Sequence, residues 1–464
     1  MNAPPAQTPT GESFFRRLAV NPAFAALWIA RTASLVGDYA FRVAFITSLV
    51  VSGESANVLA LATAVLIFPS IVFYIFGGAL GDRVRSRRTV LVWADIVRAV
   101  GTAVAAVSVM ATSNPLPVIG CALLIGIGSG FFEPVMAGFL VQIVPRHRLV
   151  KANSALSVSR QIGLIIGPVL GGALVGLSGG AIVFWFDAAT FAVSALALGA
   201  IPAAAVVYAS GETADASAGT TDTSAEATAS DKAADPAPLR RLGQDISAGI
   251  RYVASVRWLT ITLLTGSLAN AMFAGGLDVL VPLVFLSHDG KDPVQLGLFY
   301  ALEGGGALLG AVILSRLTVR RVDGPMFGML ALMAASLGLV GVFGNGLIAL
   351  ALALSYGVGM HFFNTLYPAL VQSTVPPKLI SRVSSIEFLA FDGLMPLGIL
   401  LMGPLSVWCG SRTALALIGV ATTAMILSVC LAPSVRELRL PSETDRPATA
   451  ADNPLVVLPA EEAR

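Results

Sequence analysis

The segment GALGDRVRSRRTVL, at residues 78–91, separates two long apolar runs of the chain. It holds one acid, at position 82, and arginines at positions 83, 85, 87 and 88, and such a charge cluster cannot lie in hydrocarbon. The segment therefore marks an aqueous turn at which one membrane-spanning helix ends and the next begins. Because basic residues gather on the cytoplasmic side of membrane proteins, it also indicates how the chain crosses the membrane.

The composition places the whole chain in the membrane class. Apolar residues make up 56% of the 464 residues, charged residues 12%, and the mean hydropathy is +0.81. Apolar runs of about 20 residues recur along the sequence, which is the length of a spanning helix. Because a lipid-exposed backbone must satisfy its own hydrogen bonds, we expect an all-α membrane protein with twelve transmembrane helices in two pseudo-repeated six-helix halves.

The spans and the regions between them follow from the hydropathy of successive stretches. We expect spans near residues 24–51, 58–80, 89–111, 116–141, 156–177, 181–205, 258–286, 295–315, 324–344, 347–371, 383–407 and 412–432. The predicted organisation is an N-terminal tail at 1–23, a first half at 24–205, a disordered linker at 206–243, a second half at 244–434 that starts with an interfacial helix, and a C-terminal tail at 435–464. The linker is rich in small and polar residues and cannot bury enough surface to fold alone.

Basic residues lie almost entirely on one side of this arrangement. The loops assigned to the outside carry only Lys291 and Arg412, whereas the opposite loops hold the arginines of residues 83–88 and many more. The positive-inside rule therefore predicts a multi-pass protein of the cell (inner) membrane with both termini in the cytoplasm.

Polar residues inside the spans follow single helix faces. In the first span Arg31, Ser34, Asp38 and Arg42 are spaced by three, four and four residues, which forms one stripe. Asp38 and Arg42 lie near mid-span, so we expect them to pair with each other or to face a water-filled cavity. Other candidate cavity residues follow the same logic on three further spans: Ser129 and Glu133, Asn270 and Asp278, and His361 and Asn364.

Asp38 and Glu133 are the candidate proton-coupling residues, because a carboxyl in a partly desolvated cavity titrates closer to physiological pH. Static roles are the alternative: an intrahelical pair for Asp38 with Arg42, and packing for His361. Four other intramembrane acids are expected at peripheral positions or near span ends, namely Asp187, Glu303, Glu387 and Asp392.

Small residues line one face of the fifth span. Gly163, Gly167, Gly171 and Gly172 would let a neighbouring backbone approach closely, and Pro168 removes a helix hydrogen bond and favours a bend there. A span built this way suits a helix that moves against the opposite half, with tight packing without motion as the alternative.

The opening segment suggests a conformational latch. Its charges, together with those of the following span, need partners, so we expect an inter-helix contact with the second half that forms in one state of the protein; solvated anchoring is the alternative. The residues assigned to this latch are Gly78, Asp82, Arg83, Arg87, Asp95 and Arg98.

Together these motifs resemble the major facilitator superfamily, and within it the drug-exporter branch that includes macrolide efflux and enterobactin export proteins. Gly78, Leu80, Asp82, Arg83 and Arg87 match the superfamily's signature between spans two and three. The span-five glycines with Pro168 resemble the signature of exporters. The resemblance implies that spans one, four, seven and ten line a central cavity.

We therefore expect a secondary active exporter of an amphiphilic small molecule, such as a drug, a macrolide-like compound or a siderophore-like metabolite. Proton antiport with alternating access would drive it, without a cofactor or a metal. The alternatives are a proton-linked uptake carrier and a non-transporting membrane receptor of the same fold. We expect a monomer in the lipid bilayer that binds neither nucleic acid nor ATP, since no phosphate-binding glycine loop is present. The histidines form no catalytic or metal cluster, which argues against an enzyme.

Overall fold

The computed structural model describes residues 22–84, 86–112, 114–145, 148–202, 249–286, 292–436 and 438–440. Within these ranges the side chains of residues 75, 78–83, 377, 378 and 381 are not described. The predicted linker and both predicted tails lie outside the described residues, apart from residues 22–23 and the first residues of the C-terminal tail.

Twelve apolar spans are present in the described part of the chain, which confirms the predicted all-α membrane architecture. The helices are α2 (Pro22–Val51), α3 (Ala56–Arg83), α4 (Arg87–Ala111), α5 (Leu116–Ile143), α6 (Leu149–Ser178), α7 (Gly180–Ala200), α10 (Arg257–Gly275), the π-helix η3 (Gly276–Leu280), α11 (Val281–Leu286), α12 (Pro293–Ser315), α13 (Asp323–Phe343), α14 (Leu347–Thr374), α15 (Pro377–Phe391), α16 (Met395–Cys409) and α17 (Ser411–Cys430). The seventh span is thus made of α10, η3 and α11, and the eleventh of α15 and α16. Residues 249–255, the described part of the predicted interfacial helix, are helical.

Several boundaries differ from the hydropathy prediction. Helix α6 begins at Leu149, about two turns before the predicted start, because Lys151, Asn153 and Ser154 in its first turns lower the hydropathy there. Helix α7 ends at Ala200 instead of residue 205, just before Pro202. The eleventh span is not one helix, since a turn at residues 392–394 separates α15 from α16.

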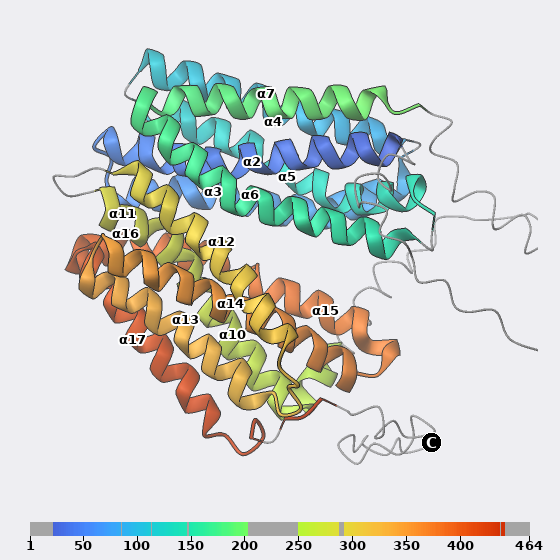
Figure 1. Cartoon of the computed structure of the whole chain (residues 1–464), viewed down its shortest axis with the longest axis vertical. Helices are drawn as coiled ribbons and strands as arrows, with labels where there is room; N and C mark the ends of the chain where they lie inside the picture. Colours follow the sequence, from blue (N-terminus) through green and yellow to red (C-terminus); the bar gives the residue numbers. More distant parts are fainter. Residues whose placement is uncertain are drawn as a thin grey trace, which may run out of the picture.

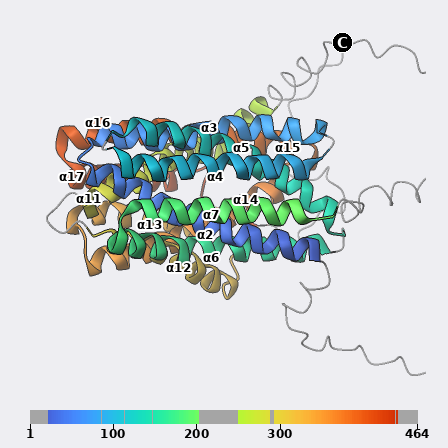
Figure 2. The ribbon, with the colours of Figure 1, turned by 90° about the horizontal axis from the view of Figure 1, so that it is seen from above.

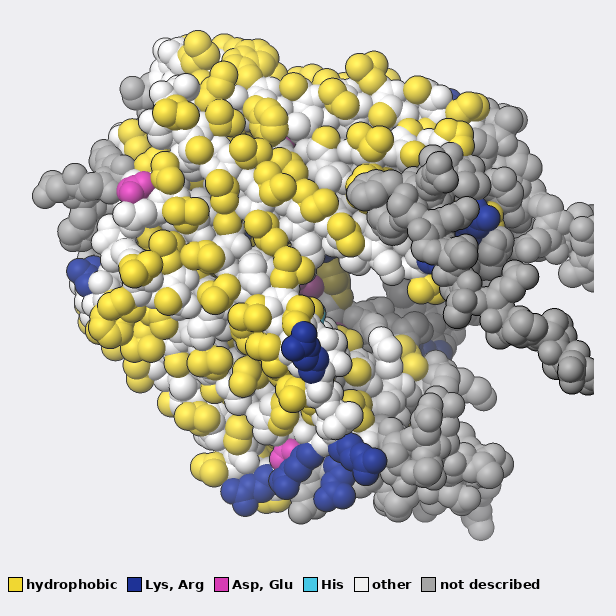
Figure 3. Space-filling model, in the orientation of Figure 1, with side chains coloured by type: hydrophobic (Ala, Val, Ile, Leu, Met, Phe, Trp, Pro, Cys, Tyr) yellow, Lys and Arg dark blue, Asp and Glu magenta, His cyan; other side chains and the backbone are white. Residues whose placement is uncertain are grey.

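The helices pack as two bundles, one of α2–α7 and one of α10–α17, with the helices of each running side by side (Figures 1 and 2). Helix α2 packs against α6 and α7, and in the second half α12 packs against α14 and α13 against α17. Large apolar side chains that are exposed, such as Trp93, Leu177 and Trp408, cover the outside of the bundles, as expected of a lipid-facing surface. Figure 3 shows hydrophobic side chains over most of one face, with Lys and Arg gathered at its lower edge.

Glycines bring α6 close to its neighbours. A Cβ atom at Gly167 would lie 2.7 Å from the carbonyl oxygen of Val36, and one at Gly171 would lie 2.6 Å from that of Ala40. Any larger residue at these positions would force α6 away from α2, which is the close backbone approach that the glycine spacing predicts.

The two halves meet along two helix pairs, α3 with α16 and α6 with α12. At the end where α3 and α12 begin, the predicted extracellular end, a Cβ atom at Gly403 would lie 2.9 Å from the Cα atom of Asn57, and one at Gly172 would lie 3.2 Å from that of Val294. Toward the opposite end, which is the predicted cytoplasmic end, the surface is hollowed between the two halves (Figure 3). This hollow leads to the cavity described next.

Candidate substrate cavity and buried charges

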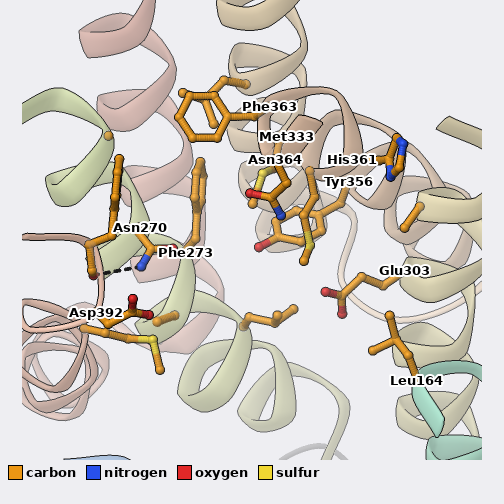
Figure 4. Close-up of a pocket in the computed structure, with 18 of the residues that line it drawn as sticks. Leu164, Asn270, Phe273, Glu303, Met333, Tyr356, His361, Phe363, Asn364 and Asp392 are labelled. Atoms are coloured by element: carbon orange, nitrogen blue, oxygen red, sulfur yellow. Dashed lines mark hydrogen bonds between the residues drawn. The ribbon is translucent and has the colours of Figure 1, made fainter. Parts of the chain in front are cut away.

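A large cavity lies between the halves and has a volume of about 760 Å³. Its first-half wall comes from α2 and α6, and its second-half wall from α10, η3 and α12–α15. This volume is in the range of small-molecule sites, which are typically apolar clefts with a few polar groups. The close-up shows Glu303 and Asp392 on opposite sides of this cavity, with Asn364 and Tyr356 between them (Figure 4).

Five of the side chains predicted to face a cavity lie on this wall: Arg42, Asn270, Asp278, His361 and Asn364. They come from three of the four predicted lining spans. The polar stripes read from the sequence therefore do mark faces that turn toward the interior of the protein.

Aromatic rings form a large part of the remaining wall in the second half. Phe363 stacks on Tyr367 with ring centroids 5.4 Å apart, and Phe391 meets both rings edge-on. Phe273 meets Tyr356 edge-on at 6.1 Å. These pairs give the cavity an apolar aromatic surface.

A second cavity, of about 350 Å³, lies beside the first and shares Tyr39, Arg42, Asp278 and Met395 with it. Helices α2, α3 and α5 provide most of its wall, which includes Asp38 and Ser129. The fourth predicted lining span thus contributes to this smaller space. Asp38 retains 30% side-chain exposure although it lies in the middle of α2.

An ion pair between Arg42 and Asp278 joins the two halves. Arg42 belongs to α2 and Asp278 to the π-helical turn η3, and the Arg42 guanidinium also lies 5.4 Å from the centroid of the Tyr300 ring. The Tyr300 hydroxyl donates to the carbonyl oxygen of Leu277, which holds the ring beside the turn. Of the two arrangements expected for Asp38 and Arg42, the intrahelical pair is not formed, and both residues instead line the smaller cavity.

A second ion pair, between Arg31 and Glu133, lies within the first half. Arg31 is 4% exposed and its guanidinium lies 5.2 Å from the Phe132 ring, whereas the Glu133 side chain is 37% exposed. Glu133 thus has a buried cationic partner and a partly exposed side chain, and it is not among the residues that line either cavity described above. Ser34, on the same stripe as Arg31, is buried, and its hydroxyl oxygen has no hydrogen-bond partner among the described residues.

A third group of charges is buried in the core of the first half. Arg98 pairs with Asp95 on its own helix and lies 3.9 Å from the carboxylate of Asp38 on α2. Its guanidinium is 4.3 Å from both the Phe132 and the Phe191 rings. The Ser194 hydroxyl on α7 donates to the second oxygen of Asp95, at 2.6 Å.

This placement corrects the latch prediction for Asp95 and Arg98. Both residues are almost completely buried among helices of the first half and pair there, so they do not reach the second half. Arg87 donates to the carbonyl oxygen of Gly138 on α5, at 3.0 Å, which is again a contact within the first half. The side chains of Asp82 and Arg83, and the position of Gly78 within its surroundings, lie outside the described part of the structure.

Glu303, Glu387 and Asp392 are expected at peripheral positions or near span ends, and the peripheral alternative is wrong for them because all three line the large cavity. Asp187 is also not peripheral: it is fully buried between α7 and α2, where the Thr190 hydroxyl contacts it. Asp187 begins a polar stripe with Thr190 and Ser194, three and seven residues later on α7, and this signal could have marked its face. Glu303 and Asp392 have no such stripe, so that signal could not reveal their position.

The family model of the Major Facilitator Superfamily matches residues 27–395, most of the chain. The chain belongs to the major facilitator superfamily. The resemblance inferred from its motifs is thereby confirmed.

Relatives within the superfamily include named efflux pumps. The multidrug efflux pump Tap of Mycobacterium tuberculosis is 24% identical over 93% of this chain and 98% of its own length. The Tap pump of Mycolicibacterium fortuitum is 26% identical over 84% of this chain and 90% of its own length. Macrolide efflux protein A of Streptococcus pyogenes is 21% identical over 90% of this chain and 96% of its own length.

Solved structures share the fold at low identity. A crystal structure of the nucleoside transporter NupG, a D323A mutant, superposes with a TM-score of 0.65 at 14% identity, over 88% of this chain and 98% of that one. A bacterial homologue of the iron transporter ferroportin in an inward-facing state gives a TM-score of 0.64 at 14% identity, over 90% of this chain and all of that one. The family match and the twelve apolar spans make the protein a multi-pass membrane transporter of the superfamily, and the named relatives are transporters.

In this major facilitator protein the span-five glycines face two different partners. Gly163, Gly167 and Gly171 abut α2, whereas Gly172 abuts the start of α12 in the other half. Pro168 lies inside a continuous α6, and its carbonyl group lies where a Cβ atom at Gly297 of α12 would be. No group of three or more His, Cys, Asp and Glu side chains that could hold a metal exists among the described residues.

Proposed function

We propose that this transporter exports an amphiphilic small molecule by alternating access, driven by proton antiport. The observation that carries the proposal is the cavity between the halves, which combines an apolar aromatic wall with ionisable side chains at membrane depth. Such side chains are expensive in a membrane and mark transport pathways. The efflux pumps among the relatives support the outward direction.

Asp38 and Glu133 are the residues proposed to couple transport to protons. Both carboxylates are partly exposed, that of Asp38 on the wall of the smaller cavity, and each pairs with an arginine that is almost completely buried. Protonation of either carboxylate would remove half of an ion pair and change the contacts between α2 and its neighbours. Glu303 is a third candidate, because it is buried on the cavity wall with no hydrogen-bond or ion-pair partner among the described residues.

The membrane orientation belongs to the same proposal. With the termini in the cytoplasm of a cell expressing the protein, the hollow between the halves opens toward the cytoplasm. A substrate dissolved there or in the inner leaflet would then reach the cavity without crossing the seam between α6 and α12. No cofactor takes part, and the proton gradient supplies about 2.3 kcal/mol per charge for each 100 mV of membrane potential.

The test is transport by the purified protein in proteoliposomes with an imposed pH gradient and a panel of amphiphilic compounds. We expect movement of at least one compound in the direction opposite to the proton flow, with loss of this coupling in Asp38→Asn or Glu133→Gln. Asp323→Asn is the matched control, because Asp323 pairs with Arg321 away from the cavity. Movement in the same direction as the protons would indicate an uptake carrier, and no movement of any compound would favour a non-transporting receptor.

A further inference from the structure

The break in the eleventh span places a helix end inside the membrane. Helix α15 ends at Phe391, residues 392–394 form a turn, and α16 starts at Met395. Gly393 and Pro396 explain the break, because glycine favours turns and proline offers no N–H to continue the hydrogen-bond ladder. The break therefore places Asp392 in a turn at membrane depth, on the wall of the large cavity.

Two carboxylates flank that helix end on the cavity wall. Glu387 lies one turn before it and accepts a hydrogen bond of 2.6 Å from the Tyr367 hydroxyl. Asp392 lies in the turn itself, half-buried, and has no hydrogen-bond or ion-pair partner among the described residues. A carboxylate at this depth without a partner is costly unless a ligand compensates it.

Aromatic faces surround the same end of the cavity. Phe363, Tyr367 and Phe391 form one cluster with ring centroids 5.4–6.4 Å apart. The Asn270 amide donates to the carbonyl oxygen of Phe391 at 2.9 Å, which fixes the last residue of α15 against α10 (Figure 4). Aromatic rings beside carboxylates form the usual recognition site for an organic ammonium group.

The charges on the cavity wall are divided between the halves. Both arginines that line it, Arg42 and Arg160, belong to the first half, and Arg42 is already paired with Asp278. The carboxylates that line the cavity all belong to the second half. Among the described residues of that half, His361 is the one basic side chain on the cavity wall. The end of the cavity formed by α15 therefore carries an excess of negative charge that no described side chain neutralises.

We propose that the aromatic and acidic end of the cavity, made by Glu387, Asp392 and the Phe363–Tyr367–Phe391 cluster, binds the positively charged group of a lipophilic cation. The proposal rests on the proposed transport function and names its substrate class. The rest of the molecule lies against Phe273, Met333 and Tyr356, which form the apolar wall. An anion of the same shape would meet the carboxylates, and binds less well.

The experiment measures equilibrium binding to the purified full-length protein in lipid nanodiscs. The probes are tetraphenylphosphonium and tetraphenylborate, which present the same four phenyl rings with opposite charge. Empty nanodiscs correct for partition into lipid. We expect saturable binding of the cation at least about tenfold tighter than binding of the anion, since tenfold corresponds to about 1.4 kcal/mol.

Variants locate the site. Asp392→Asn and Glu387→Gln are each expected to weaken binding of the cation about tenfold, and Asp392→Glu to retain most of it. Glu54→Gln removes one negative charge away from the cavity and is expected to leave binding unchanged. Circular dichroism and a monodisperse elution profile establish that each variant is folded.

Equal or tighter binding of tetraphenylborate, no saturable binding of the cation, or unchanged cation binding in a folded Asp392→Asn variant would overturn the inference. The transport assay separates this failure from failure of the proposed function. If proteoliposomes export neutral or anionic compounds in exchange for protons, export stands and the cation site does not. If nothing is transported while the cation binds with the expected charge preference, the site stands and export does not.

Discussion

Replacing Arg98 by methionine tests whether the first half is held together by its buried charge cluster. Methionine retains much of the volume of the arginine stem but removes the charge that Asp95 and Asp38 face. Asp95 is completely buried, so its carboxylate would be left with only the Ser194 hydroxyl as a polar partner. Loss of one member of a buried ion pair costs about 3–5 kcal/mol.

The contacts of Arg98 with aromatic rings set a lower limit on the loss of stability in Arg98→Met. The Arg98 guanidinium lies 4.3 Å from the rings of both Phe132 and Phe191, and each such contact contributes about 0.5–1 kcal/mol or more when it is desolvated. Even if Asp95 took up a proton in the variant, these contacts would still be lost. We therefore expect Arg98→Met to lower the free energy of unfolding by about 3–5 kcal/mol, with about 1 kcal/mol as the smallest loss compatible with the structure.

The assay is equilibrium unfolding in mixed detergent micelles, followed by circular dichroism, on wild type, Arg98→Met, Asp95→Asn and the double variant. The double variant should recover about 2 kcal/mol or more relative to Arg98→Met, because no buried carboxylate remains at position 95. Arg316→Met, at the exposed end of α12, is the control and should change stability by less than about 0.5 kcal/mol. A loss below about 1 kcal/mol in Arg98→Met, or strictly additive effects in the double variant, would refute the reasoning.

Three further changes probe the interface and the cavity wall. Gly172→Val places a side chain against Pro293 and Val294 between the halves, so overpacking of about 1–3 kcal/mol should slow substrate transport in proteoliposomes. Gly419→Ala, against Gly338 within the second half, should lower thermal stability and leave the rate per folded molecule unchanged; equal effects of the two variants on that rate would contradict this assignment. Arg42→Gln should destabilise the protein in a thermal-shift assay, and adding Asp278→Asn should restore part of the loss, unless the inter-half pair contributes nothing.

The sequence predicts the twelve spans because each is a continuous apolar run, and hydropathy reads such runs directly. It also predicts which faces turn inward where two or more polar residues share a face, as with Asn270 and Asp278. It does not predict partners across helices. Asp38 lies four residues before Arg42, a spacing that favours an intrahelical pair, yet the rotation of α4 brings Arg98 to Asp38 instead.

The sequence also does not predict that Glu303 and Asp392 face the cavity. Glu303 and Asp392 have no polar neighbour at helical spacing that would mark their face as cavity-lining, and only the packing of α12 and α15 shows it. Gly393 and Pro396 mark the break after Phe391 in the sequence. A hydropathy window does not detect it, because the window is much longer than this turn. The latch prediction is wrong for Asp95 and Arg98 because a charge pair can be satisfied within one half as well as between halves.

The π-helical turn at Gly276–Leu280 changes which residues of the seventh span share a helix face. This matters when substitutions or labels are placed on that span. A π turn holds about one residue more than an α turn, so the helix faces on either side of it are out of phase by about 100°. A single helical wheel drawn through α10 and α11 would therefore assign residues 281–286 to the wrong faces. Cysteine pairs or spin labels designed on this span need two separate registers, one counted forward to Gly275 and one counted back to Val281.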